Sequence, residues 1–180
     1  MQISELIIHL QEEAAHEMPP FGAESIKIAH RLGSDATSFL LEQLEAGGWT
    51  AFLALEALRE SDTVSYSSIP ARKRVGIYVE VLRHSIFYNA WGLPGYQFTN
   101  TAYALISLGE EAFAALKPLL DDQRPAPLSG SQDATTSATY GNRICDYAWV
   151  LICEIRGQSY IYFYSPAERD REIEKLRVVE

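Results

Sequence analysis

The stretch that decides the fold is "ALISLGEEAFAALKPLLDD", residues 104–122. Its apolar residues recur at helical spacing, stop at Gly109, and resume at helical spacing after two glutamates. A glycine lets a helix end in a left-handed conformation that other residues avoid. Acidic side chains directly after the glycine stabilise the next helix, because they face the positive end of its dipole. The stretch therefore predicts two antiparallel helices joined by a tight turn.

A second copy of this pattern occurs earlier, in "AHRLGSDATSFLLEQLE", residues 29–45. Both copies contain Leu-Gly, then a polar residue and an acid, then an alanine, then leucines. The copies are 76 residues apart, from Leu32 to Leu108, which is roughly two steps of 38, a period typical of stacked helical repeats. The matched positions are Leu32 and Leu108, Gly33 and Gly109, Ala36 and Ala112, Leu40 and Leu116, and Leu44 and Leu120.

Helical periodicity continues through most of the chain and predicts an all-α fold of about nine helices. The segment "SDTVSYSS" (residues 61–68) is expected to be a loop, and Pro118 is expected to kink its helix. Ser165, Pro166 and Glu168 form a capping-box pattern that predicts the start of the last helix. The other helices are expected at residues 3–16, 22–32, 35–46, 49–60, 70–84, 99–108, 110–121 and 142–156.

These motifs resemble the HEAT-like α-helical repeat proteins, especially bacterial ones of unassigned role. The resemblance rests on residues 104–122 and on "YGNRICDYA" (140–148) and "SPAERDREI" (165–173), and it covers about residues 22–178. It implies a single HEAT-like domain over residues 1–180, built as a short right-handed α-solenoid of antiparallel helix pairs. It also implies binding of other macromolecules along a concave face rather than catalysis.

The net charge of −9 is unevenly distributed along the sequence. Residues 1–62 contain eleven acids and three bases, whereas the remaining residues are nearly neutral. This excess disfavours a nucleic-acid partner, which requires basic surface, and is compatible with a basic protein partner. The simpler interpretation is that the acids keep the chain soluble. We expect the side chains of Glu5, Glu12, Glu13 and Glu17 to be solvated on the first helix.

Several features favour a cytoplasmic protein. No apolar run approaches the about 18 residues of a membrane span, and the N-terminal residues do not resemble a signal peptide. The two cysteines, Cys145 and Cys153, would lie about 12 Å apart on one helix. A disulfide requires Cα atoms within about 7 Å, so we expect two buried free thiols, which suit a reducing compartment.

No known catalytic motif occurs in the sequence, and we expect no enzyme activity, cofactor or metal. The nearest approach to a metal site is "HLQEEAAH", in which His9, Glu13 and His16 share one side of the first helix. A structural metal would require a fourth ligand from elsewhere. A solvated helix face is the preferred interpretation.

Asp146 is the only charged residue between Arg143 and Glu154 in an apolar segment. A carboxylate on so apolar a helix is expected to be partly buried, and then it requires a partner. The candidate partners are Arg143, Arg124 and Arg169. We expect a structural ion pair that holds the preceding loop or the last helix; a ligand-binding acid is the alternative.

Two long connections, at residues 87–98 and 121–141, offer a second kind of site. The first contains Phe87, Tyr88, Trp91, Tyr96 and Phe98, which are either plugs over the core or anchors for a partner. The second is longer than most structureless connections. An enzyme or small-ligand site under these loops is therefore the alternative function. Its candidate residues are Trp91, Tyr96, Arg124, Tyr140, Arg143 and Asp146.

The bases of "ARKR" (residues 71–74) open a helix, where cations oppose the dipole. Glu60 and Asp62 are the expected compensating acids, and a phosphate or acidic partner is the alternative. A nucleic-acid binder acting through Arg72–Arg74 is thus a third possibility. The leading interpretation is a non-catalytic protein-interaction module or scaffold, for example an immunity or regulatory protein. Its acidic residues Glu12, Glu13 and Glu17 would face a basic partner.

Overall fold

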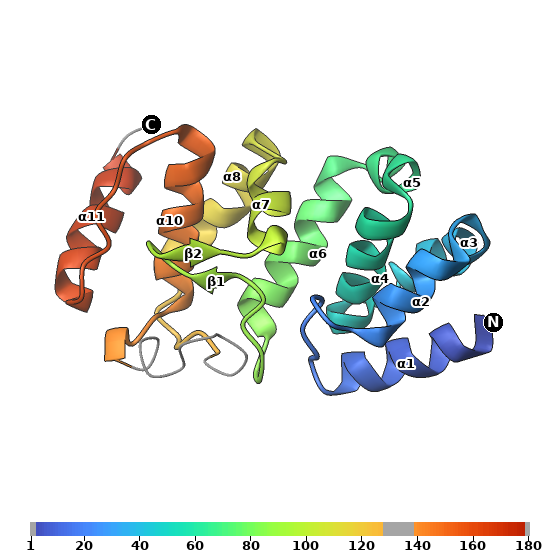
Figure 1. Cartoon of the computed structure of the whole chain (residues 1–180). Coiled ribbons are helices and arrows are strands. Elements are labelled where there is room, and N and C mark those ends of the chain that lie inside the picture. The colour runs from blue at the N-terminus through green and yellow to red at the C-terminus, as the bar shows by residue number, and fades with distance from the viewer. Residues whose placement is uncertain (1–2, 128–138, 179–180) are drawn as a thin grey trace. The chain divides into compact units, whose positions relative to one another are not determined.

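The computed structural model describes residues 3–127 and 139–178, and it is mostly helical (Figure 1). The all-α prediction is therefore confirmed. The chain divides into two compact units, Met1–Tyr88 and Asn89–Glu180. Among the described residues, no helix is long and apolar enough to cross a membrane.

In the first unit, one apolar helix forms the centre. α4 (Gly48–Ser61) contacts each of the other five helices, and nine of its fourteen residues are buried. A helix that is apolar all round must be covered on every side. The surrounding helices are α1 (Ile3–Ala15), α2 (Glu24–Leu32), α3 (Ser34–Gln43), α5 (Thr63–Ser68) and α6 (Ala71–His84).

In the second unit, α10 (Ile144–Arg156) has the same central position, with ten of its thirteen residues buried. It packs against α7 (Asn100–Ile106), α8 (Glu110–Leu116), the 3-10 helix η1 (Lys117–Asp121) and α11 (Pro166–Val178). A short antiparallel hairpin precedes these helices. Its strands β1 (Gly92–Leu93) and β2 (Gln97–Phe98) pair Gly92 with Phe98 and Leu93 with Gln97.

The two Leu-Gly copies occupy equivalent turns, one in each unit, as predicted. Gly33 has φ 56° and ψ −130°, and Gly109 has φ 58° and ψ −127°. Each glycine directly precedes the second helix of its pair. Both second helices then contact the central helix of their unit. The matched alanines and leucines after each glycine are buried: Ala36, Leu40 and Leu44 in the first copy, and Ala112, Leu116 and Leu120 in the second.

The expected loop at residues 61–68 is wrong, because α5 occupies most of it. Asp62 is the N-cap residue of this helix, and its carboxylate accepts hydrogen bonds from the hydroxyl and backbone N–H of Ser65. These bonds, together with one from the Thr37 hydroxyl, lower the pKa of Asp62 to about 2. An acid at the N-cap stabilises even a short helix.

The helix expected at 110–121 changes type near Pro118. The α-helix ends at Leu116 and continues as η1. Proline has no N–H and its ring clashes with the preceding turn, so a regular α-helix cannot continue through it.

The aromatic connection also differs from expectation, because part of it forms the β1–β2 hairpin. Its turn is Leu93-Pro94-Gly95-Tyr96, closed by a hydrogen bond from the Tyr96 N–H to the Leu93 carbonyl. Proline followed by a glycine of positive φ (73°) suits such a turn.

The two glycine turns give a direct test of the repeated helix pair. Gly33→Ala and Gly109→Ala should each lower the free energy of unfolding by about 1–3 kcal/mol, because alanine is strained at positive φ. An added Cβ meets no atom within 4 Å at either position, so the whole effect would come from the backbone. Urea denaturation followed by circular dichroism measures it.

Gly76 is the matched control, since it lies within α6 and a Cβ there also meets nothing. Gly76→Ala should stabilise the protein by about 0.5–1 kcal/mol. Destabilisation of similar size at all three glycines would contradict the assignment of Gly33 and Gly109 as special turn positions.

Candidate functional site

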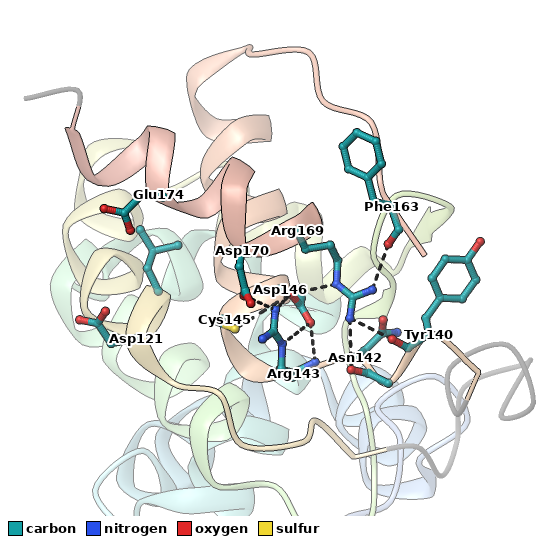
Figure 2. Close-up of polar contacts among 12 residues, drawn as sticks. Asp121, Tyr140, Asn142, Arg143, Cys145, Asp146, Phe163, Arg169, Asp170 and Glu174 are labelled. Atoms are coloured by element: carbon teal, nitrogen blue, oxygen red, sulfur yellow. Dashed lines mark hydrogen bonds and ion pairs between the residues drawn. The ribbon is translucent and has the colours of Figure 1, made fainter. Parts of the chain in front are cut away.

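The carboxylate of Asp146 lies at the centre of a buried polar cluster in the second unit (Figure 2). Asp146 is in the first turn of α10 and accepts a hydrogen bond of 2.9 Å from the backbone N–H of Arg143. The Arg143 guanidinium donates two more, of 2.9 and 3.1 Å. Arg169 of α11 approaches the same carboxylate, with its Nε 3.1 Å away, and is itself fully buried. The predicted pairing of Asp146 with arginine is confirmed.

Arg169 also binds backbone carbonyl groups outside α10 and α11. Its guanidinium donates to the carbonyls of Phe163 and Tyr164, each at 2.9 Å. It donates as well to the carbonyls of Tyr140 and Gly141, at 2.9 and 3.3 Å. One arginine thus joins α10, α11, the connection between them and the end of the 121–141 connection. This arrangement is typical of a structural cluster.

The charges in this cluster balance, because Asp170 accepts a hydrogen bond of 2.7 Å from Arg143. Two carboxylates therefore face two guanidinium groups. Arg124, the third candidate partner of Asp146, is instead exposed and pairs with Asp122. The described contacts of Asp146 are those of a structural ion pair.

The helix α11 is attached mainly through polar groups. Arg169 and Ile173 are its only buried residues among those described.

The helix α10 carries the two free cysteines, Cys145 and Cys153, both buried as expected. Burial raises the pKa of each thiol to about 11. Both thiols are therefore protonated and unreactive at neutral pH unless the packing opens.

A small pocket of about 100 Å³ lies beside the hairpin of the second unit. The Tyr162 hydroxyl donates to the Asn142 side-chain oxygen at 2.6 Å within its lining. Gly95 packs so closely that a Cβ there would lie 2.2 Å from Cβ of Tyr162. Among the described lining residues there is no carboxylate, imidazole, thiol or amine, so these residues offer no nucleophile–base pair. It is lined by Leu93, Pro94, Gly95, Tyr96, Tyr140, Asn142 and Tyr162.

The aromatic residues of the 87–98 connection have different environments. Tyr88 and Trp91 are buried, each in its own unit, which agrees with the plug interpretation. Phe87 and Tyr96 are exposed and are not plugs. Tyr96 is therefore an exposed residue that lines the pocket. Trp91 is too deeply buried to contact a partner.

In the first unit, Glu13 is buried rather than solvated, so the sequence expectation is wrong for this residue. Its carboxylate accepts hydrogen bonds from the backbone N–H groups of Glu24 and Ser25 and from the Ser25 hydroxyl. These groups lie at the start of α2, where the N-cap residue is Ala23 and has no capping side chain. Glu13 thus caps a helix from eleven residues away.

Glu17 is also used inside the first unit. Its carboxylate accepts three consecutive backbone N–H groups: Ile86 at 2.9 Å, Phe87 at 2.8 Å and Tyr88 at 3.2 Å. Glu17 has a φ of 49° and is the only described residue other than glycine with positive φ. Glu17 is half-buried and its carboxylate is engaged by the backbone, so the expected solvation holds only in part for this residue, whereas Glu12 is exposed.

A second buried carboxylate, Glu56, lies on the central helix α4. It accepts hydrogen bonds of 3.0 and 3.1 Å from Arg59 and one of 2.7 Å from the Tyr78 hydroxyl. Burial raises the pKa of Tyr78 well above its usual value, so this hydroxyl remains a donor. Both central helices thus carry one buried acid paired with an arginine three residues away.

Most acids of residues 1–62 are therefore engaged within the unit. Seven of the eleven make ion pairs or hydrogen bonds: Glu13, Glu17, Glu24, Glu45, Glu56, Glu60 and Asp62. Within the described part of the chain, no such contact engages the other four, which are all exposed: Glu5 and Glu12 on α1, and Asp35 and Glu42 on α3.

The bases at the start of α6 have other partners than expected. Lys73 forms an ion pair with Glu45, and the Arg74 guanidinium lies 4.7 Å from the centre of the Tyr66 ring. Glu60 pairs with Arg59, and Asp62 caps α5, so neither compensates these bases. Arg72 remains exposed.

The arrangement His9, Glu13 and His16 is not a metal site in the described structure. Glu13 is already saturated with donors, and a ring nitrogen of His16 lies 2.8 Å from the Glu12 carbonyl. Across the described residues, no group of three or more metal-ligating side chains comes together.

Comparison of the chain with protein-family models, with curated proteins and with solved structures finds no match.

Replacing Asp146 tests the buried cluster. Asp146→Ala leaves Arg169 buried without its carboxylate, and should lower the free energy of unfolding by about 3 kcal/mol. Labelling of Cys145 and Cys153 by a thiol reagent should accelerate as well. Glu110→Ala, which breaks an exposed ion pair with Arg156, is the control and should cost less than about 1 kcal/mol. An unchanged denaturation midpoint for Asp146→Ala would show that the cluster does not contribute to stability.

Two neighbouring glutamates test the helix cap. Glu13→Ala should destabilise the protein by about 1–2 kcal/mol, because it leaves N–H groups at the start of α2 buried without a hydrogen-bond acceptor. Glu12→Ala removes the same charge from the exposed side of α1 and should have almost no effect. Equal urea midpoints for the two variants would refute the role of Glu13.

Proposed function

We propose that the chain is a non-catalytic protein-interaction module that binds a basic partner protein through the acidic side of its first unit. The observation that carries this proposal is the division among the acids of residues 1–62. Seven make contacts within the unit, while Glu5, Glu12, Asp35 and Glu42 are exposed and without a described ionic partner. Charge with no structural use is available to a partner, and it raises the rate of encounter with a basic protein.

The spacing of these acids supports a surface rather than scattered charges. Glu5, Ile8 and Glu12 follow one another at i, i+3 and i+7, which places them along one side of α1. Asp35 and Glu42 have the same i, i+7 relation on α3. The side chain of Ile8 is 54% exposed between its two glutamates. An apolar residue flanked by acids suits a basic partner that also contributes apolar contacts.

The architecture supports the same class of function. Gly33 and Gly109 lie at matching turns. The helices that follow them, α3 and α8, pack on the central helices α4 and α10. This arrangement fits a HEAT-like repeat. In that proposal the helix pairs form a short right-handed solenoid that serves as a scaffold, as in an immunity or regulatory protein. The two buried thiols fit a cytoplasmic location.

A small-ligand binder is the second candidate, and the pocket beside the hairpin is the observation that favours it. Its described lining residues supply aromatic walls and one amide but no catalytic pair, which suits binding better than a reaction. A nucleic-acid binder acting through Arg72–Arg74 has less support, since Lys73 and Arg74 are already engaged.

Exchanging the exposed acids tests the proposed function. The partner is first captured from the native host with the full chain and identified. Glu5→Gln combined with Glu12→Gln should then slow its association about tenfold at low salt, with an unchanged urea midpoint. Rising salt should slow the unmodified protein in the same way, since screening acts over about 10 Å at 0.1 M.

The control is Glu111→Gln with Glu168→Gln, which removes the same charge from exposed positions of the second unit. It should change the association rate less than twofold or so. If the association rate changes neither with salt nor in the α1 variants, the acidic side of the first unit is not the binding surface.

A further inference from the structure

Two exposed apolar connections come together at the end of α1. Met18 and Phe21, which follow α1, are 45% and 68% exposed, and Ile86 and Phe87, which follow α6, are 72% and 59% exposed. Glu17 joins the two connections through its hydrogen bonds to the backbone of Ile86 and Phe87. We call these four residues the clasp patch. Large apolar side chains that gather on a surface mark a binding site more often than single ones do.

The backbone of Glu17 has a conformation that is unfavourable for a residue other than glycine. Glu17 follows the end of α1, and the Met18 N–H donates to the Glu13 carbonyl at 2.9 Å. This i to i−5 bond closes a helix end at which the residue of positive φ is usually glycine. Glutamate stands there instead, with a φ of 49°. Unlike glycine, the glutamate at this position supplies a carboxylate that binds the backbone of the second connection.

The hydrogen bonds of Glu17 also hold the clasp patch in place before a partner binds. Three backbone N–H groups fix the 86–88 segment on Glu17. Pro19 and Pro20, which separate Met18 from Phe21, have fixed φ angles. A preorganised apolar surface loses little conformational freedom on binding, which favours affinity.

We propose that the clasp patch docks an amphipathic basic segment of a partner protein. The apolar side chains of the segment would pack on Phe21 and Phe87, and its lysines or arginines would face the acids of α1. Charge complementarity selects this occupant: Glu12 lies one turn from the end of α1, and Glu5 lies about 10 Å further along the helix. The proposal rests on the proposed function, since it names the kind of partner segment and where it binds.

The test uses a synthetic amphipathic helical peptide of leucine and lysine, with binding to the full chain followed by fluorescence anisotropy. Phe21→Ser combined with Phe87→Ser should weaken binding at least about tenfold, as expected when two central aromatic anchors are lost. Val64→Ser with Ile161→Ser is the matched control, because both residues are highly exposed and neither belongs to the connections that follow α1 and α6. It should leave the affinity within about twofold.

Glu17→Gly provides a second variant that is sensitive to the clasp. Glycine suits the positive φ, so the end of α1 should keep its geometry while the 86–88 segment is released. Peptide affinity should fall although Phe21 and Phe87 are still present. Unchanged affinity in both Glu17→Gly and the double phenylalanine variant would overturn the proposal.

The outcomes separate the patch from the proposed function. If the α1 glutamine variants weaken peptide binding and the phenylalanine variants do not, the acidic surface stands and the clasp patch is refuted. If neither set has an effect, both are refuted. Equal binding of a leucine–glutamate peptide would refute the basic occupant. Self-association of the chain that the phenylalanine changes abolish, without an effect on the peptide, would assign the patch to a second copy instead.

Discussion

Each unit is organised by the burial of one helix that has no polar side facing water. Most residues of α4 and α10 are buried by the surrounding segments of their unit, so a polar group among those residues must find its partner inside. Glu56 is held by Arg59 and Tyr78, and Asp146 by Arg143 and Arg169. The short helix pairs with their glycine turns, the polar helix α11 and the capped helix α5 can all be understood as coverings of these two helices.

This constraint also explains where the charge of the protein goes. An acidic sequence suggests an acidic surface, yet seven of the eleven acids in residues 1–62 contact other groups of the first unit. Glu13 and Asp62 cap helices, Glu17 accepts backbone N–H groups, and Glu56 is in a buried ion pair. The other three are in exposed ion pairs: Glu24, Glu45 and Glu60. Glu13 and Glu17 accept hydrogen bonds from backbone N–H groups of segments that are distant in the sequence. The acids left for a partner are few, and they lie on α1 and α3. Two of them flank the exposed Ile8, and α1 leads directly into the apolar clasp patch.

Local patterns in the sequence predicted much of this structure. The repeated Leu-Gly motif identified both helix pairs, and the isolated charge of Asp146 identified a buried ion pair. The roles of Glu13 and Glu17 could not be predicted, because their partners are backbone groups distant in the sequence that leave no trace in residue types. One signal was available: α2 starts after Ala23, which cannot cap it, so its N–H groups required an acceptor from elsewhere. The short helix α5 was missed because its Asp62 N-cap was read as part of a loop.

We propose that the exposed side of α1 and the clasp patch bind a partner, while α4 and α10 each remain fixed within their own unit. Hydrogen–deuterium exchange of the full chain, with and without the captured partner, tests this most directly. We expect the partner to slow exchange in α1 and at residues 17–21 and 86–88. The amides of α4 and α10 should be the slowest in both samples and should not change. Protection confined to residues 89–180, or rapid exchange throughout α4 and α10, would contradict the account.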